Sequence, residues 1–579
     1  MLLSLIVLFL FAAPDRDGEL LRAIRYLSGV SELEQLDQSE VERYEALAAR
    51  PIPLNRASRS RLVGSGLFSA YQLATLADYR ARNGDILSFA ELAVVDGFGE
   101  ECARALKPFL TLEPVLAPGA LPDSARAAHE TAFYAAVARK SDASASGQGL
   151  KYGLKYRFSY GGRWALALAA KSGYDAALFP PEGGSAYALY QGNGTLGKVI
   201  LGSFNARFGQ GLVRWSGFSL ETPSGTGSFS RRPSLLSPAW SYSGSGTLLG
   251  AAADFQLGRS LVSAYATLPL KGAWQAGANA SFFGRYGEAG TTAVFERTAS
   301  GERRIFVSAD ARCNLRGVDL FGEAALRLPE KTAALRAGAR SKLGDALVAA
   351  LLVRAVPSRY SGRSGGEYAL SAGLDFSAGE YVPLAGKSGF GSSRRRHTGS
   401  LTAEASALPV PERDTGRKQL KIIASWTWQL DGRWSATLRI SERLRNYDVL
   451  NRSDVRIDVR REEGPWTLGF RANAVASERW GMLGYAEGGY RTDGAWLWLR
   501  ATLFWADAWN DRIYCYERDA PGQFNVPAYY GRGWSLSAVG ALKTRRWGRW
   551  YLSGGWTGYA RAEKKPGKAE LKLQWVSTF

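Results

Sequence analysis

Basic side chains at every second position are the chemical feature that this sequence repeats most regularly. Lys151, Lys155 and Arg157 alternate with leucine, tyrosine and glycine, and Arg433 and Arg439 follow the same spacing farther along the chain. Successive side chains of an extended strand point to opposite faces, so the cations of each strand share one face. Rows of this kind attract an anionic chain.

Groups for catalysis or metal binding are scarce. The two histidines, His129 and His397, have no recognisable nucleophile or acid beside them, and the glycine- and serine-rich pieces lack the strand–turn–helix setting of a nucleophile elbow. The cysteines Cys102, Cys313 and Cys515 are far apart and odd in number, which fits neither a disulfide framework nor a metal site. We therefore expect no enzyme, no metal and no cofactor.

Composition indicates a membrane wall built of strands. The chain has 579 residues, with 66 Gly, 18 Trp and 26 Tyr, and its mean hydropathy is −0.18. A helical membrane protein would carry runs of about 20 apolar residues, and none follows the first dozen positions. High glycine, high aromatic content and near-neutral hydropathy favour a wall that is apolar on one face and polar on the other.

The charge is distributed unevenly between two parts of the chain. The formal net charge is +20, but residues 14–115 contain 12 Lys and Arg against 16 Asp and Glu. The remainder carries 61 basic and 37 acidic residues, so the basic character belongs to the C-terminal part alone.

The C-terminal part has the periodicity of a transmembrane barrel. Leu150 to Tyr160 and Trp164 to Ala170 alternate apolar with small or charged residues, and Gly161-Gly162 between them predicts a hairpin turn. Strands of about ten residues, joined by tight turns and longer Gly/Ser-rich loops, are typical of such barrels. We predict a mainly β fold, with a large antiparallel barrel of about 22–26 strands over residues 129–579. A soluble β-sandwich is the alternative.

The last segment, Leu571 to Phe579, again alternates and ends in an aromatic residue. It resembles the closing strand that outer-membrane barrels present to their assembly machinery. The first segment, residues 1–13 (MLLSLIVLFLFAA), has the apolar run and small residues of a signal peptide, and no cysteine follows as in a lipoprotein. We expect export to the bacterial outer membrane, with the N-terminal domain in the periplasm.

If the apolar face of the barrel meets lipid, the basic rows point inward and line a lumen that water fills unless something plugs it. Residues 203–245, which include Arg231-Arg232, are too long for a turn. They either fold into the lumen as a plug or form an external loop. Residues 384–398 are a second basic loop, either solvated or paired with lipopolysaccharide phosphates.

The N-terminal part reads as a small all-α domain. Residues 15–50 have the spacing of two short amphipathic helices, and residues 114–128 read as a linker. Between them, residues 54–113 contain Leu54-Asn55-Arg56-Ala57-Ser58, Asp78-Tyr79-Arg80, Asn83-Gly84 and Val95-Asp96-Gly97-Phe98-Gly99. In the order and spacing of these pieces the segment resembles the tandem helix-hairpin-helix module of the competence DNA-receptor family.

The resemblance implies a phosphate contact at one hairpin. In such modules a Gly-apolar-Gly turn lets backbone N–H groups approach a phosphate, and Gly97, Phe98 and Gly99 keep this pattern. Glu100 and Glu101 follow at once, and residues 54–113 carry no net charge, so we expect DNA binding to be weak. The alternative is a module for packing or docking.

A second resemblance extends over most of the chain. Phe208-Gly209-Gln210-Gly211-Leu212-Val213, followed by Gly217-Phe218-Ser219, resembles a stretch in the helix-hairpin-helix barrel proteins of Bacteroidetes-type outer membranes. It implies a barrel fused to such a module and leaves the biochemical role open.

Three functions fit these observations. The first is a channel that handles or imports DNA or another polyanion, which the periplasmic module receives. The second is a structural or docking subunit of an envelope secretion or assembly machine, with the helical module binding protein. The third is a general or substrate-specific pore. Lipid and lipopolysaccharide are expected partners in each case, and DNA or other envelope proteins are the further candidates.

Overall fold

The computed structural model describes residues 16–36, 38–115, 127–142, 144–177, 179–217, 222–242, 246–344, 346–361, 366–383, 392–408, 416–430, 433–447, 450–563 and 565–578. The expected signal peptide (1–13), most of the expected linker (114–128) and Phe579 lie outside these residues.

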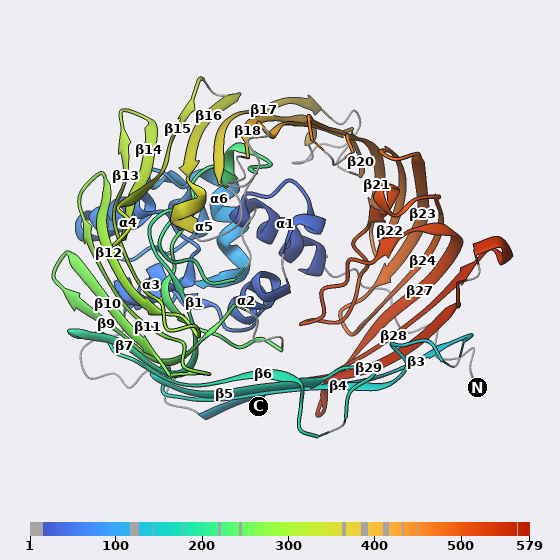
Figure 1. Cartoon of the computed structure of the whole chain (residues 1–579), viewed down its shortest axis with the longest axis horizontal. Coiled ribbons are helices and arrows are strands. Elements are labelled where there is room, and N and C mark those ends of the chain that lie inside the picture. Colours follow the sequence, from blue (N-terminus) through green and yellow to red (C-terminus); the bar gives the residue numbers. More distant parts are fainter. Residues whose placement is uncertain are drawn as a thin grey trace.

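The chain forms a closed antiparallel β-barrel of 24 strands, each paired with its neighbours in chain order (Figure 1). The first strand, β3, closes the circle by pairing with the last, β29, where Glu130 lies opposite Thr578. A short additional strand, β8 (Leu235–Pro238), pairs with the end of β7. The prediction of a large antiparallel barrel with 22–26 strands is confirmed.

The barrel strands are β3 (Ala127–Lys140), β4 (Gly149–Tyr160), β5 (Trp164–Ser172), β6 (Gly183–Gln191), β7 (Leu196–Arg207), β9 (Leu248–Leu257), β10 (Ser260–Thr267), β11 (Trp274–Phe283), β12 (Gly287–Arg297), β13 (Arg303–Leu315), β14 (Val318–Leu328), β15 (Thr332–Lys342), β16 (Leu347–Val356), β17 (Glu367–Pro383), β18 (Ser392–Ala407), β19 (Lys418–Gln429), β20 (Trp434–Arg445), β21 (Arg452–Glu463), β22 (Trp466–Ala476), β23 (Trp480–Arg491), β24 (Ala495–Ala506), β27 (Gly531–Thr544), β28 (Gly548–Tyr559) and β29 (Lys568–Thr578).

The predicted alternation sets which side chains face lipid. Leu154 of β4 and Leu166 and Leu168 of β5 are 37%, 55% and 41% exposed on the outer surface. Lys155, the residue after Leu154 on β4, is 6% exposed and points inward. Gly161 and Gly162 have φ of +61° and +65°, the left-handed backbone that a two-residue hairpin turn requires. An apolar outside and a polar inside are the arrangement that an outer-membrane barrel needs.

The two ends of the barrel differ in their connections. At the end where β3 begins and β29 finishes, the described connections are two to four residues long; we call it the turn end. At the opposite loop end, most connections are longer, and two of them, 208–247 and 507–530, fold inward. Short turns face the periplasm in outer-membrane barrels, which places the turn end there and the protein in the outer membrane.

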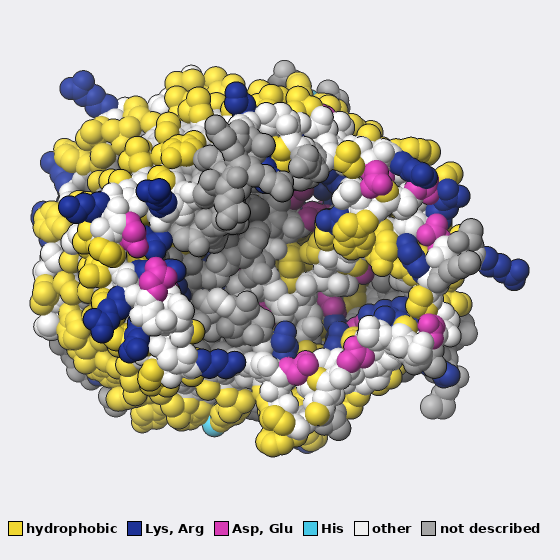
Figure 2. Space-filling view, viewed as in Figure 1, with side chains coloured by type: hydrophobic (Ala, Val, Ile, Leu, Met, Phe, Trp, Pro, Cys, Tyr) yellow, Lys and Arg dark blue, Asp and Glu magenta, His cyan; other side chains and the backbone are white. Residues whose placement is uncertain are grey.

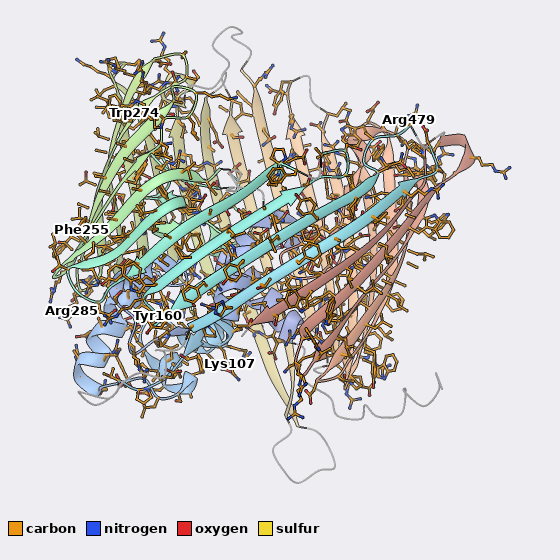
Figure 3. The ribbon with its side chains drawn as sticks, turned by 90° about the horizontal axis from the view of Figure 1, so that it is seen from below. Lys107, Tyr160, Phe255, Trp274, Arg285 and Arg479 are labelled. Carbon is orange, nitrogen blue, oxygen red and sulfur yellow. The ribbon has the colours of Figure 1, made fainter. Side chains whose placement is uncertain are left out.

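The helices precede the barrel in sequence and lie at its turn end, some of them inside the barrel and others beyond the ends of the strands (Figures 1 and 3). They are α1 (Arg16–Ser28), η2 (Leu33–Gln35), α2 (Gln38–Ala49), α3 (Arg59–Ser65), α4 (Ala70–Asn83), α5 (Phe89–Val94), α6 (Gly99–Leu106) and η3 (Lys107–Phe109). A parallel pair, β1 (Ile52–Pro53) with β2 (Leu110–Thr111), closes the unit. We call residues 16–111 the helical plug. In the described residues no helix is long and apolar enough to cross a membrane.

Candidate functional site: the plugged lumen

One side of the helical plug joins the barrel through an apolar core. Leu62, Val63 and Leu67 of the plug pack in the same buried cluster as Phe204 of β7 and Leu236 of β8. Of these, Leu67, Phe204 and Leu236 are fully buried. Helix α3 contacts β7, β8 and β9, and β8 thus packs against both the plug and the wall. This contact fixes the plug to the wall by the same packing that forms a domain core.

The other side of the helical plug meets the wall through ion pairs. Glu32 bonds Arg439 of β20 and lies 3.1 Å from Arg456 of β21. Glu34 accepts a hydrogen bond of 2.6 Å from Arg471 of β22. We call Glu32 and Glu34 with these three arginines the acidic latch.

The electrostatics of Glu34 show how strongly the wall holds it. Burial alone would raise the pKa of its carboxyl, but Arg471 and Arg456 outweigh that effect and hold the pKa at about 2. The backbone N–H of Tyr516, in the inward loop 507–530, donates a further hydrogen bond of 3.2 Å to the same carboxylate. Glu34 is therefore ionised in the docked plug at neutral pH.

Further buried polar contacts join the plug to the wall, one of them on β4 and one on the apolar side itself. Lys155 of β4 and Glu42 of α2 form an ion pair of 2.7 Å that is almost inaccessible to solvent. Ser60 of α3 donates a hydrogen bond of 2.9 Å to Asp254 of β9, which also pairs with Lys198 of β7 at 3.0 Å. Unpaired buried charges are costly, so these cations and carboxylates require each other.

The described residues of the long connection 208–247 lie inside the barrel. Phe229 is fully buried against Phe321 and Leu352 of the wall. Arg232 donates a hydrogen bond of 3.2 Å to the carbonyl of Leu67 in the plug. Of the two alternatives for residues 203–245, a plug or an external loop, the inward one holds for the described residues, and residues 218–221 and 243–245 lie outside them.

A close backbone approach joins this connection to the plug. Gly29 lies so near Gly227 that a Cβ at Gly29 would stand 2.6 Å from a Gly227 backbone atom. Gly29 also has φ of +73°, so glycine is required here for space and for conformation.

The second inward loop, 507–530, supports the plug from the loop end. The Gly522 N–H donates a hydrogen bond of 2.7 Å to Glu45 of α2, and Gln38 donates one of 3.3 Å to the Gly522 carbonyl. Sequence reasoning did not single out this loop, although its length of 24 residues is the signal that could have found it.

The remaining predicted basic residues have partners within the barrel. Lys151 pairs with Glu570 at 3.1 Å, and Arg157 pairs with Glu130. Arg231 donates a hydrogen bond of 3.1 Å to the Gln210 carbonyl. Arg433 pairs with Glu463 at 2.8 Å on an exposed turn at the turn end, so it lies at the rim. The inward row is thus basic, but much of it is neutralised.

The predicted phosphate-binding hairpin lies on the plug, where it lines the cavity described below. Gly97 and Gly99 have φ of +84° and +72°, and Phe98 is buried against Phe68. A Cβ at Gly97 would stand 2.9 Å from Tyr71. The turn between α5 and α6 is therefore tight at Gly97, whereas a Cβ at Gly99 would meet no atom within 4 Å, so only the backbone conformation requires glycine there.

The two glutamates after this hairpin are engaged. Glu100 pairs with Arg104 on its own helix, and Glu101 pairs with Arg396 of the barrel. Arg396 belongs to β18, which begins at Ser392, so this part of the predicted basic loop 384–398 is strand. This described part lies at the turn end, where Arg396 pairs with the plug. Residues 384–391 lie outside the described part.

A cavity of about 3190 Å³ remains between the plug, the inward loops and the wall. The residues that line it include 22 Lys and Arg against 16 Asp and Glu. Figure 2 shows the molecule hollowed along its axis, with charged side chains of both signs around the opening. Within the described residues, no group of three or more His, Cys, Asp and Glu is placed to hold a metal ion.

No protein-family model and no curated protein matches this sequence. Solved structures of outer-membrane barrels match it weakly. The P pilus usher (PapC) translocation pore is 12% identical, with a TM-score of 0.33 over 78% of this chain and 99% of that one. The siderophore receptor PirA from Pseudomonas aeruginosa is 8% identical, with a TM-score of 0.39 over 78% and 80%. The outer membrane protein opdK from the same organism is 9% identical, with a TM-score of 0.28 over 78% and 99%.

Proposed function

We propose that this protein is a gated outer-membrane channel for anionic cargo, with DNA or another polyanion as the class, and that the helical plug is its gate. The observation that carries the proposal is the acidic latch. Carboxylates of the plug form ion pairs with arginines of a basic lumen wall, and an anionic cargo would otherwise bind these arginines. Cargo and plug therefore compete for the same cations.

The charge distribution supports the same mechanism. The plug part of the chain carries more acidic than basic residues, and the barrel part carries a large basic excess. A gate that matches the charge of the cargo is displaced by that cargo through simple competition, without a separate trigger. Once the gate is displaced, the exposed wall attracts anions and repels cations. We further propose that the protein acts without enzymatic chemistry.

The helix-hairpin-helix resemblance fits this proposal as a receiving module on the periplasmic side. In the docked plug, Glu101 is engaged with Arg396 and the Gly97–Gly99 turn faces the cavity. Movement of the plug would free both for contact with emerging cargo.

The test uses the full chain in planar bilayers, with wild type compared to a Glu32→Gln/Glu34→Gln variant. We expect a low conductance for wild type and a larger, anion-selective conductance for the variant, measured as a reversal potential under a salt gradient. A single-stranded oligonucleotide should block the variant's current. Cation selectivity, or a variant current that the oligonucleotide leaves unchanged, would refute the anionic cargo, and the absence of any current in the variant would refute the channel and favour the docking subunit.

A further inference from the structure

Three cations lie directly opposite one another on neighbouring strands of the wall. In the register of β19, β20 and β21, Lys421 faces Arg443, and Arg443 faces Arg452. Directly opposed residues have Cα atoms about 4.5–5.5 Å apart, and like charges in such positions destabilise a sheet. A row of three therefore calls for a compensating anion.

The row faces the lumen. Leu420, Ile440 and Val455 are exposed on the lipid side, at 37%, 46% and 43%. Each is an odd number of residues from the cation on its own strand, and side chains alternate along a strand. The three cations are therefore on the inner face.

The acidic residue directly opposite Lys421 is already engaged. Glu404 of β18 lies opposite Lys421, but it pairs with Arg354 at 2.9 Å and accepts hydrogen bonds from Ser371 and Thr222. Among the residues that the structure describes, neither Lys421 nor Arg443 has an ion pair or a hydrogen bond.

The third cation of the row, Arg452, points the same way with little neutralisation. It donates hydrogen bonds to the backbone carbonyls of Asn510 and Arg512 in the inward loop 507–530. Its carboxylate contact, with Asp454, is 3.7 Å long, and Asp454 is shared with Arg439. The row thus keeps a strong positive charge.

A second row of the same strands shows what neutralises such a repulsion. Arg439 and Arg456 are also directly opposite each other, four residues nearer the turn end. At about 3.4 Å per residue the two rows are about 14 Å apart. Glu32 of the plug contacts both arginines of the lower row. In the described residues, the upper row has no such carboxylate.

We propose that Lys421, Arg443 and Arg452 form a binding site for a phosphate group. This site would be the first position at which the anionic cargo binds, on the loop-end side of the acidic latch. This inference rests on the proposed function and names the chemical group that it recognises. Three converging cations suit a group with several acceptor oxygens and more than one charge, and guanidinium groups bind phosphate through parallel hydrogen bonds. Cargo bound here lies on the loop-end side of Arg439 and Arg456, the two arginines that Glu32 contacts. From there a second phosphate of the same cargo can displace the Glu32 carboxylate.

The test measures binding to the detergent-purified full chain by titration calorimetry, with tripolyphosphate and a single-stranded oligonucleotide as probes at constant ionic strength. We expect the Lys421→Gln/Arg443→Gln variant to bind both probes at least about tenfold more weakly than wild type. The matched control, Arg163→Gln/Arg433→Gln, removes two cations at the turn end and should bind both probes as wild type does.

Thermal unfolding separates loss of the site from loss of the fold. Without a probe, the Lys421→Gln/Arg443→Gln variant should unfold at no lower temperature than wild type, because the substitutions relieve repulsion. Tripolyphosphate should raise the unfolding temperature of wild type and of the control only.

Three results would overturn the site: no binding of tripolyphosphate to wild type, equal weakening in the control, or weakened oligonucleotide binding with unchanged tripolyphosphate binding. Because these readouts involve no transport, tripolyphosphate binding that persists in a protein without anion-selective conductance would remove the proposed function and leave the site.

Discussion

The two sides of the helical plug are attached to the barrel by different forces. Toward β7, β8 and β9 the contact is mainly apolar and includes the fully buried Leu67 and Leu236, with a buried hydrogen bond from Ser60 to Asp254 beside it. Toward β20, β21 and β22 it consists of carboxylates on arginines. Apolar packing is insensitive to salt and to anions, whereas ion pairs are weakened by both. The difference indicates a plug that is anchored on one side and released on the other.

The largest expected effect comes from weakening the anchored side. Leu236→Ala should cost about 2–5 kcal/mol of docking free energy, because it opens a cavity in the cluster between α3 and the wall. Faster cleavage of the plug by trypsin, with an unchanged heat-modifiable barrel on gels, would show this. Leu166→Ala is the matched control, since Leu166 faces lipid at 55% exposure; equal cleavage in both variants would contradict the anchor.

The next largest effect comes from the released side. Glu34→Gln should cost about 3 kcal/mol, because it leaves Arg471 with Asp458 as its remaining carboxylate partner. Urea unfolding of the plug should measure the loss, and trypsin should cleave α1 and α2 before α3. Glu463→Gln, which removes a carboxylate at the rim, is the control. Cleavage that begins at α3 would reverse the assignment of the two sides.

Acidification should weaken the same side more gently. The pKa of Glu34 is lowered from 4.5 to about 2 in the docked plug. A lowered carboxyl pKa stabilises docking above the ordinary value, so this contribution is complete above pH 4.5 and is lost as the pH falls toward 2. Conductance should rise over that window in wild type, and the contribution of this group should be absent in Glu34→Gln. An identical pH dependence in both proteins would exclude Glu34 as its source.

The smallest effect separates two adjacent glutamates. Glu101 pairs with Arg396 across the interface, whereas Glu100 pairs with Arg104 on its own helix. Both pairs are partly exposed, so Glu101→Gln should weaken docking by about 0.5–1 kcal/mol and Glu100→Gln should leave it unchanged. Trypsin cleavage rates of the two variants would compare them, and equal rates would remove Glu101 from the interface.

The sequence was sufficient for the barrel, because alternation has a direct structural cause. The lipid-facing leucines and the inward Lys155 and Arg157 follow from a period of two residues, and the 24 strands lie within the predicted range. Two-residue alternation is set by the backbone alone and needs no knowledge of partners.

The docking of the plug was not predicted, because its partners are remote in sequence. Glu34 and Arg471 are 437 residues apart, and a glutamate between two amphipathic helices reads as solvated. The opposite charges of the two parts are visible in the sequence. The basic charge of the barrel part was interpreted as a sign of an anionic cargo, and the lack of basic charge in the helical part as a sign of weak DNA binding, rather than as a sign that the two parts pair with each other. Glu101 was likewise interpreted as repelling phosphate, whereas in the structure it pairs with Arg396.

The most direct test of a gating plug is to lock the latch segment in place. Ser31 donates its N–H to Ser224 Oγ at 3.1 Å, which links the chain beside Glu32 to the inward loop 208–247. Cysteines at Ser31 and Ser224 can be introduced into the Glu32→Gln/Glu34→Gln variant, with the three native cysteines replaced. Under oxidation, or with a short bifunctional thiol reagent, we predict a conductance as low as wild type, and reduction of the disulfide should restore the anion-selective current. A current that is the same in the locked and reduced states would contradict the plug as the gate.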